Sequence, residues 1–206
     1  GYIKDIVITK PEYLYLIENG IDVKVKDGYV FESTNERPYK NLVDFLFESR
    51  LKNEDNPSLA DLFKTIINSL YGITYELNDL YEENDKGEIE WLGFRAGDFF
   101  NPVIASYITA IIRTYLSKVS YNIIENGGQV YLNMTDSIIY NGEVTLDVFS
   151  DVKALGKFDP PELIEEVIIL GAGRYEYRDV LKQKYTIKSR GFSVSVKDKS
   201  FYSDFD

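Results

Sequence analysis

The feature that most constrains the fold is a long apolar stripe in the middle of the chain. Between Asn101-Pro102 and Asn126-Gly127-Gly128, apolar residues recur at spacings of three and four, which predicts one long helix with a capped start and a glycine stop. The apolar arc is wide, so we expect this helix to lie beneath a sheet rather than on the surface. The stripe consists of Val103, Ile104, Tyr107, Ile108, Ile111, Ile112, Tyr115, Leu116, Val119 and Ile123.

Shorter elements are predicted on both sides of this helix. Residues 11–18 are expected to be helical, a second helix begins at Pro38, and a third begins at Asn56-Pro57 and ends at Gly72. A short strand is expected over residues 3–9, a β-hairpin over 21–31 around Asp27-Gly28, and a hairpin or inserted loop over 74–97. Further strands are expected at 129–133, 137–140, 167–170, 175–178, 184–188 and 192–196. The order of elements predicts an α+β fold with an antiparallel sheet backed by long helices.

Composition excludes several kinds of chemistry. The chain has no Cys and no His, so thiol catalysis, disulfides, zinc-ligand clusters and a histidine base are ruled out. Any metal must be held by carboxylate oxygens, which indicates Mg²⁺ or Mn²⁺. The net charge of −11 argues against strong DNA binding by this chain alone. With no long apolar run and no signal peptide, neither a membrane span nor secretion is expected. Because the chain begins at Gly1 and its only methionine is Met134, we expect it to be a cut piece of a longer protein, a processed product or a fragment that retains part of a tag.

A compact motif ends the third predicted helix. Lys64, Asn68 and Tyr71 in the segment KTIINSLYG are spaced by four and three residues, so they share one helix face. A cation and an amide placed this way suit a triphosphate and a sugar, and the aromatic ring can pack under a nucleotide. The pattern Lys-x-x-x-Asn-Ser-x-Tyr-Gly resembles the fingers motif of family B DNA polymerases. The resemblance implies that Lys64 binds the phosphates of an incoming dNTP and that Asn68 and Tyr71 line the nucleotide pocket.

A second motif lies about sixty residues further on, at the turn between two predicted strands. The segment YLNMTDSI resembles the palm motif Tyr-x-Asp-Thr-Asp-Ser of the same family. By this resemblance Asp136 is a catalytic residue and a direct ligand of Mg²⁺ or Mn²⁺. Met134 stands where the family has its first Asp, and a thioether cannot replace a carboxylate at a hard-metal site.

The late strands carry a weaker resemblance to the family's primer-binding motifs. Arg174 and Tyr175 lie in a segment similar to Lys-x-Tyr, with Gly173 in place of the Lys. Lys188 and Arg190 lie in a segment similar to Lys-Gly, with Arg190 in place of the Lys. The resemblance implies that these residues contact DNA. From the residues alone, a solvated strand face is an equal alternative.

The short spacings favour a terminal-protein-primed polymerase and imply an ordered set of regions. These are residues 1–37 as an N-terminal α/β segment of the palm, 38–73 as fingers helices, 74–98 as an inserted loop or hairpin, 99–200 as palm and 201–206 as a frayed tail. The implied partners are primer-template DNA, dNTP, a terminal protein and the remainder of the polymerase. The implied setting is a host cell in which a viral or plasmid genome is replicated. The family's insertion encircles the template, but the carboxylates of this one would repel phosphate.

Two functional hypotheses remain at this point. The family's earlier palm motif, Asp-x-x-Ser-Leu-Tyr-Pro, is absent from the chain, so the chain alone should not polymerise. It performs two-metal nucleotidyl transfer either as part of a longer DNA polymerase or as a half that needs a partner, or it is a degenerate palm retained as a structural or protein-interaction module.

Overall fold

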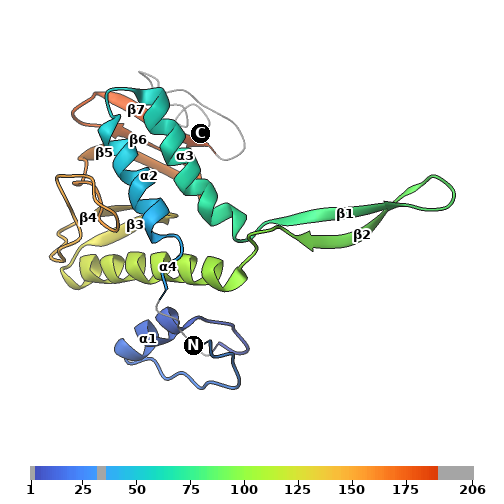
Figure 1. The fold of residues 1–206 in the computed structure, drawn as a ribbon. Coiled ribbons are helices and arrows are strands. Elements are labelled where there is room, and N and C mark those ends of the chain that lie inside the picture. Colours follow the sequence, from blue (N-terminus) through green and yellow to red (C-terminus); the bar gives the residue numbers. More distant parts are fainter. Residues whose placement is uncertain (1–2, 32–35, 190–206) are drawn as a thin grey trace. The chain divides into compact units, whose positions relative to one another are not determined.

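The computed structural model describes residues 3–31 and 36–189 of the 206-residue chain. Within these ranges it contains four helices and three small antiparallel sheets (Figure 1). The α+β class is therefore confirmed, but the strands form three separate sheets in place of a single one. The chain divides into two compact units, residues 1–114 and 115–206, and the boundary falls within helix α4 (Pro102–Glu125). No helix in the described ranges is both long enough and apolar enough to cross a membrane.

In the first unit, α2 (Lys40–Lys52) and α3 (Pro57–Ile73) pack on each other as a helical hairpin. Asn56 caps α3, because its side-chain oxygen accepts a hydrogen bond from the Leu59 N–H at 3.3 Å, and Pro57 occupies the first helical position. Both features follow the sequence prediction. Leu46 is the buried residue of α2, whereas Phe45 on the neighbouring side is exposed.

Strands β1 (Leu77–Glu83) and β2 (Ile89–Ala96) form a two-stranded arm that follows α3 (Figure 1). The hairpin alternative predicted for this segment is thus confirmed. Among the residues that the structure describes, these two strands pair only with each other, and every residue in them is exposed except Gly93, which is half-buried. Their pairing is interrupted by a bulge between Leu80 and Tyr81.

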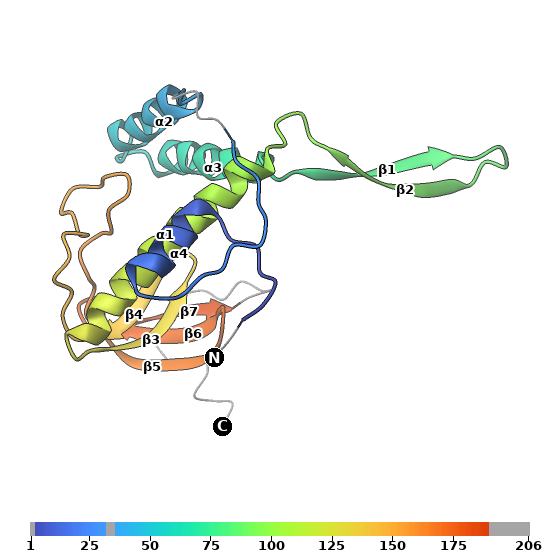
Figure 2. The same ribbon diagram turned by 90° about the horizontal axis from the view of Figure 1, so that it is seen from below.

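The second unit contains the other two sheets. Strands β3 (Gln129–Met134) and β4 (Ser137–Asn141) form a hairpin, and β5 (Ile164–Gly171), β6 (Arg174–Asp179) and β7 (Lys184–Ser189) form a meander. The β3–β4 hairpin lies between the C-terminal part of α4 and the three-stranded sheet (Figures 1 and 2). The strands predicted in this region are confirmed up to β7.

The core of the second unit fixes the β3–β4 hairpin on α4. Val119 and Ile123 of α4 are buried against Val148, with hairpin residues packed around them, including Val130 and Ile138. The turn from α4 into β3 needs glycine at position 128, because a Cβ there would lie 2.3 Å from the carbonyl oxygen of Asn141.

The expected burial of the long helix is only partly correct. Its stripe is covered by the sheet at Val119 and Ile123, but Ile111 and Ile112 remain more than 40% exposed.

Three other sequence predictions have different outcomes. The helix predicted at 11–18 is confirmed as α1 (Lys10–Glu18). The strand predicted at 3–9 and the hairpin predicted at 21–31 are wrong, since both segments are irregular in the described structure. Apolar alternation supports a strand only when one face is covered, and Val25, Tyr29 and Val30 are all exposed. The strand predicted at 192–196 and the tail at 201–206 lie outside the described residues.

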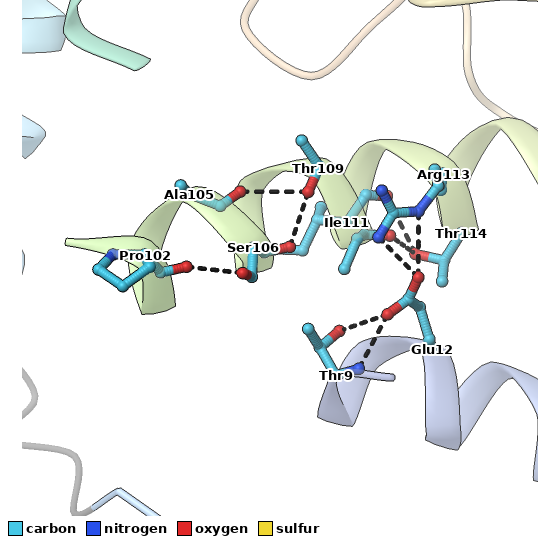
Figure 3. Close-up of polar contacts among 10 residues, drawn as sticks. Thr9, Glu12, Pro102, Ala105, Ser106, Thr109, Ile111, Arg113 and Thr114 are labelled. Atoms are coloured by element: carbon cyan, nitrogen blue, oxygen red, sulfur yellow. Dashed lines mark hydrogen bonds and ion pairs between the residues drawn. The ribbon is translucent and has the colours of Figure 1, made fainter. Parts of the chain in front are cut away.

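A polar contact joins α1 to the N-terminal part of α4 (Figure 3). Arg113 donates from Nε and Nη2 to Oε1 of Glu12, at 3.0 and 2.7 Å. The other oxygen of Glu12 accepts from the N–H and the hydroxyl of Thr9 at the start of α1, at 2.8 and 3.0 Å. Partial burial raises the pKa of Glu12, but the hydrogen bonds from Thr9 and Arg113 outweigh it and hold the pKa below its usual value. One carboxylate therefore caps α1 and ties it to α4.

We expect Glu12→Ala to lower the free energy of unfolding by about 1 kcal/mol at neutral pH, since it removes a helix cap and a partly exposed ion pair. Because the folded pKa is depressed, this contribution is present above the unfolded pKa near 4.5 and is lost as the pH falls through the lower folded value. Urea denaturation at neutral pH and at about pH 3 should show the difference shrinking in acid. Glu48→Ala removes only an exposed pair with Lys52 and should change stability by less than about 0.5 kcal/mol. A difference of equal size at both pH values would contradict this assignment.

Candidate nucleotidyl-transfer site

The three residues predicted to bind nucleotide lie on one exposed face of α3. Lys64, Asn68 and Tyr71 are all exposed, whereas Phe63 and Ile67 on another face of the helix are half-buried. Within residues 3–31 and 36–189, no hydrogen bond or ion pair occupies the Lys64 ammonium. The helix therefore presents a cation, an amide and an aromatic ring together, as the spacing predicted.

The shallow hollow beside the end of α3 is not built from these three residues. It is lined by Ser69, Gly72, Ile73, Tyr75, Glu76 and Leu77. The triad on α3 thus forms an open surface within its own unit rather than the wall of that hollow.

Asp136 lies at the tip of the β3–β4 hairpin, in the second unit. Met134 pairs with Ser137, so Thr135 and Asp136 alone make the turn. A two-residue turn gives the carboxylate little freedom to move relative to its strands. Asp136 is exposed, while Met134 is half-buried. Thr135 has a φ of 47°, in the left-handed region that β-branched residues disfavour.

The tip of this hairpin contacts the tip of the next one. Gly171 pairs with Arg174, so Ala172 and Gly173 form the turn between β5 and β6. The N–H of Gly173 donates to Sδ of Met134 at 2.9 Å. The Ser137 hydroxyl lies close enough to Tyr175 to affect the pKa of the Tyr175 hydroxyl. Met134, which pairs with Ser137 to close the Asp136 turn, is therefore held by the turn between β5 and β6.

The Asp136 carboxylate is close enough to Tyr175 to affect the pKa of its hydroxyl. Burial raises the pKa of the Tyr175 hydroxyl, the adjacent Tyr177 raises it further, the hydrogen bond with Ser137 opposes the increase, and the charge of Asp136 adds to it. The rings of Tyr175 and Tyr177 are stacked with their centroids 6.4 Å apart.

The residues predicted to contact DNA do not all share one face. Tyr175 pairs with Lys188 across β6 and β7, so these two side chains lie on the same face of the sheet. Arg174 is the neighbour of Tyr175 along β6 and lies on the opposite face. Arg190 lies outside the described residues. The structure thus brings Asp136, Tyr175 and Lys188 to one side of the three-stranded sheet.

Much of the basic stretch near β6 and β7 is neutralised by carboxylates. Lys182 bridges Glu162 and Asp179, at 3.2 and 2.8 Å, and Arg178 pairs with Glu165 and Glu166. Because these cations already pair with carboxylates of the same unit, the sheet has less positive charge available for binding a phosphate backbone.

The described residues do not by themselves build a metal centre. No group of three or more potential protein ligands converges anywhere in residues 3–31 and 36–189. At the hairpin tip Asp136 supplies a single carboxylate, and the thioether of Met134 is unsuited to Mg²⁺ or Mn²⁺. Asp136 therefore belongs to no group of converging metal ligands among the described residues.

The contact between Met134 and Gly173 was not predicted from the sequence. Both positions depart from the family pattern described above, and they turn out to touch each other. The fact that both positions differ from the family pattern was the only hint in the sequence that they touch. Local periodicity cannot show that two residues 39 positions apart are in contact.

Most of this chain is similar to a known viral protein. Over 178 residues the chain is 34% identical to the DNA polymerase of Acidianus bottle-shaped virus (isolate Italy/Pozzuoli), a match that covers 84% of this chain. The chain is a distant homologue of part of a viral DNA polymerase. It spans only 23% of that polymerase. No family model matches the chain, and no solved structure matches it.

We expect Thr135→Asn to raise the free energy of unfolding by about 1 kcal/mol, because asparagine tolerates the left-handed conformation that threonine resists. Thr135→Ala is the matched control, since it keeps a Cβ in the same conformation and should gain much less. Chemical denaturation of the three proteins provides the measurement. Equal stability of the Asn and Ala variants would show that the turn carries no strain at this position.

Proposed function

We propose that this chain forms part of the nucleotidyl-transfer core of a viral DNA polymerase of family B that is primed by a terminal protein. The supporting observation is the 178-residue similarity to a viral DNA polymerase. The motif on α3 and the motif on the β3–β4 hairpin suggest which residues would take part in the reaction. Because the chain spans less than a quarter of that relative, the proposed activity belongs to a longer polymerase that contains this chain.

The proposed division of labour follows the two units. Lys64 neutralises the phosphates of an incoming dNTP, and Asn68 and Tyr71 contact its sugar and base. Asp136 contributes one carboxylate to Mg²⁺ or Mn²⁺, with the remaining ligands supplied from outside the described residues. Such metals, when bound, activate a primer hydroxyl and stabilise the leaving pyrophosphate. Tyr175 and Lys188, together with Arg174 and Arg190, are proposed to contact the primer strand.

A second candidate is a non-catalytic module that keeps the polymerase fold. The contact between Met134 and Gly173 favours it, because a thioether faces this turn where the family places a carboxylate. The net charge of −11 is also more typical of a surface that does not grip nucleic acid.

Primer extension by the full-length gene product, with Mg²⁺ and separately with Mn²⁺, distinguishes the two candidates. We expect Asp136→Asn to reduce extension about a hundredfold or more, because loss of a direct metal ligand removes several kcal/mol of transition-state stabilisation. Asp147→Asn is the matched control, an exposed carboxylate in the same unit whose loss should leave extension unchanged. Absence of extension in both metals from folded protein, unaltered by Met134→Asp, would support the non-catalytic module.

We expect Lys64→Ala to raise the KM for dNTP about tenfold, because it removes a charge-assisted contact to phosphate. Steady-state kinetics with varied dNTP would measure this. Lys52→Ala removes an exposed lysine that pairs with Glu48 on α2 and should leave KM unchanged. An unchanged KM in the Lys64 variant would show that Lys64 does not bind the phosphates of the dNTP. The role of Asp136 is tested separately, by the primer-extension experiment.

A further inference from the structure

The β1–β2 arm concentrates negative charge. Residues 76–98 carry eight acidic and two basic side chains, a net charge of −6 out of −11 for the whole chain. Near the end of the arm Glu82 lies directly opposite Glu90, an arrangement that repels unless cations approach. The side-chain amide of Asn84 donates hydrogen bonds to the carboxylates of Glu90, at 2.7 Å, and Glu88, at 3.2 Å, which offsets part of this repulsion.

The bulge sorts the apolar residues of the arm onto one face. Leu80 pairs with Gly93, and Tyr81 pairs with Trp91, so Leu92 is the extra residue. Gly93 makes this possible with a φ of 128°, which other residues rarely adopt. Residues paired across strands share a face, so the bulge brings Trp91 to the same side as Phe94 although they are three positions apart. We call this side the apolar face; its large side chains are Leu77, Tyr81, Ile89, Trp91 and Phe94.

The apolar face is ordered but uncovered. The rings of Trp91 and Phe94 meet edge to face with centroids 5.3 Å apart, and the Trp91 indole N–H donates to Asp79 at 2.9 Å. Even so, Trp91 is 54% exposed and Ile89 is 75% exposed. A two-stranded hairpin is marginal in water without such a face being covered. The charged groups on this face are Asp79 and Glu83, and it carries no cation.

The negative charge of the arm determines which kind of molecule can bind to the apolar face. Stacking of single-stranded nucleic acid on aromatic rings requires a cationic groove, and the carboxylates of the arm would repel phosphate. A second copy of the chain would bring two acidic rims together. A protein surface with an apolar centre and a rim of Lys or Arg side chains satisfies both the rings and the carboxylates.

We propose that the apolar face of the β1–β2 arm is a docking surface for a basic protein partner rather than for nucleic acid. The five large apolar side chains supply the contact area, and Asp79 and Glu83 select for cations at its edge. This role is independent of nucleotidyl transfer, so it holds for an active polymerase and for a non-catalytic module alike.

Trp91 is the only tryptophan of the chain, so its fluorescence reports directly on the apolar face. We expect a short peptide of alternating leucine and lysine to shift Trp91 emission to shorter wavelength in a saturable manner. A leucine-glutamate peptide of the same length should not do so, and added salt should weaken the leucine-lysine complex. Single-stranded oligothymidylate should produce no shift.

Two variants locate the binding to this face. Phe94→Ser should weaken the peptide complex about tenfold, whereas Leu80→Ser, on the opposite face, should leave it unchanged. The double variant Asp79→Asn, Glu83→Gln keeps every ring in place and should weaken binding at low salt only. It therefore tests the proposal even if Phe94→Ser disturbs the hairpin. A shift with oligothymidylate, equal losses in Phe94→Ser and Leu80→Ser, or no shift with the leucine-lysine peptide would each overturn the proposal.

Discussion

The packing of the last turns of α4 against the β3–β4 hairpin determines where Asp136 lies. Val119 and Ile123 are almost wholly buried beneath that hairpin, and full burial of such a side chain contributes about 1.5–3 kcal/mol. Tyr115 adds to the same core by stacking on Phe158, which follows the hairpin in the chain, with ring centroids 5.4 Å apart. The hairpin is thus fixed along its length by α4 and at its tip by the contact with Gly173. The position of the Asp136 carboxylate therefore depends on contacts at both ends of the hairpin that carries it.

The contact at the hairpin tip gives a physical meaning to two departures from the family pattern. By resemblance, a carboxylate stands at position 134 and a lysine at position 173, whereas this chain has Met134 and Gly173. Here both positions are neutral, and the glycine N–H meets the thioether at 2.9 Å. Each change is therefore compatible with the other, which a reading of either position alone would not reveal.

The sequence predicted those parts of the fold that depend on local patterns. Helix α3 followed from its cap at Asn56 and its apolar stripe, and the β3–β4 hairpin followed from two short strands around one turn. The hairpin predicted at 21–31 failed because alternation was present without any surface to cover it. The exposure of Ile111 and Ile112 was missed for a related reason, since periodicity measures the width of an apolar arc but not how much of it a neighbour covers. The face shared by Tyr175 and Lys188 required the strand register, which the sequence does not specify.

The bulge at Leu92 has a consequence for how the arm can diverge. Since side chains alternate along a strand, loss of Leu92 alone would remove the bulge and leave regular pairing, with Trp91 still opposite Tyr81 and on the same side as Phe94. The two rings would then be two positions apart in place of three, and the apolar face would be unchanged. If Leu92 were kept and the pairing became regular, the segment from Ile89 to Trp91 would instead move to the other side and the aromatic residues would be divided between two surfaces. The position of the bulge, and not the length of the arm, therefore decides what surface the arm offers.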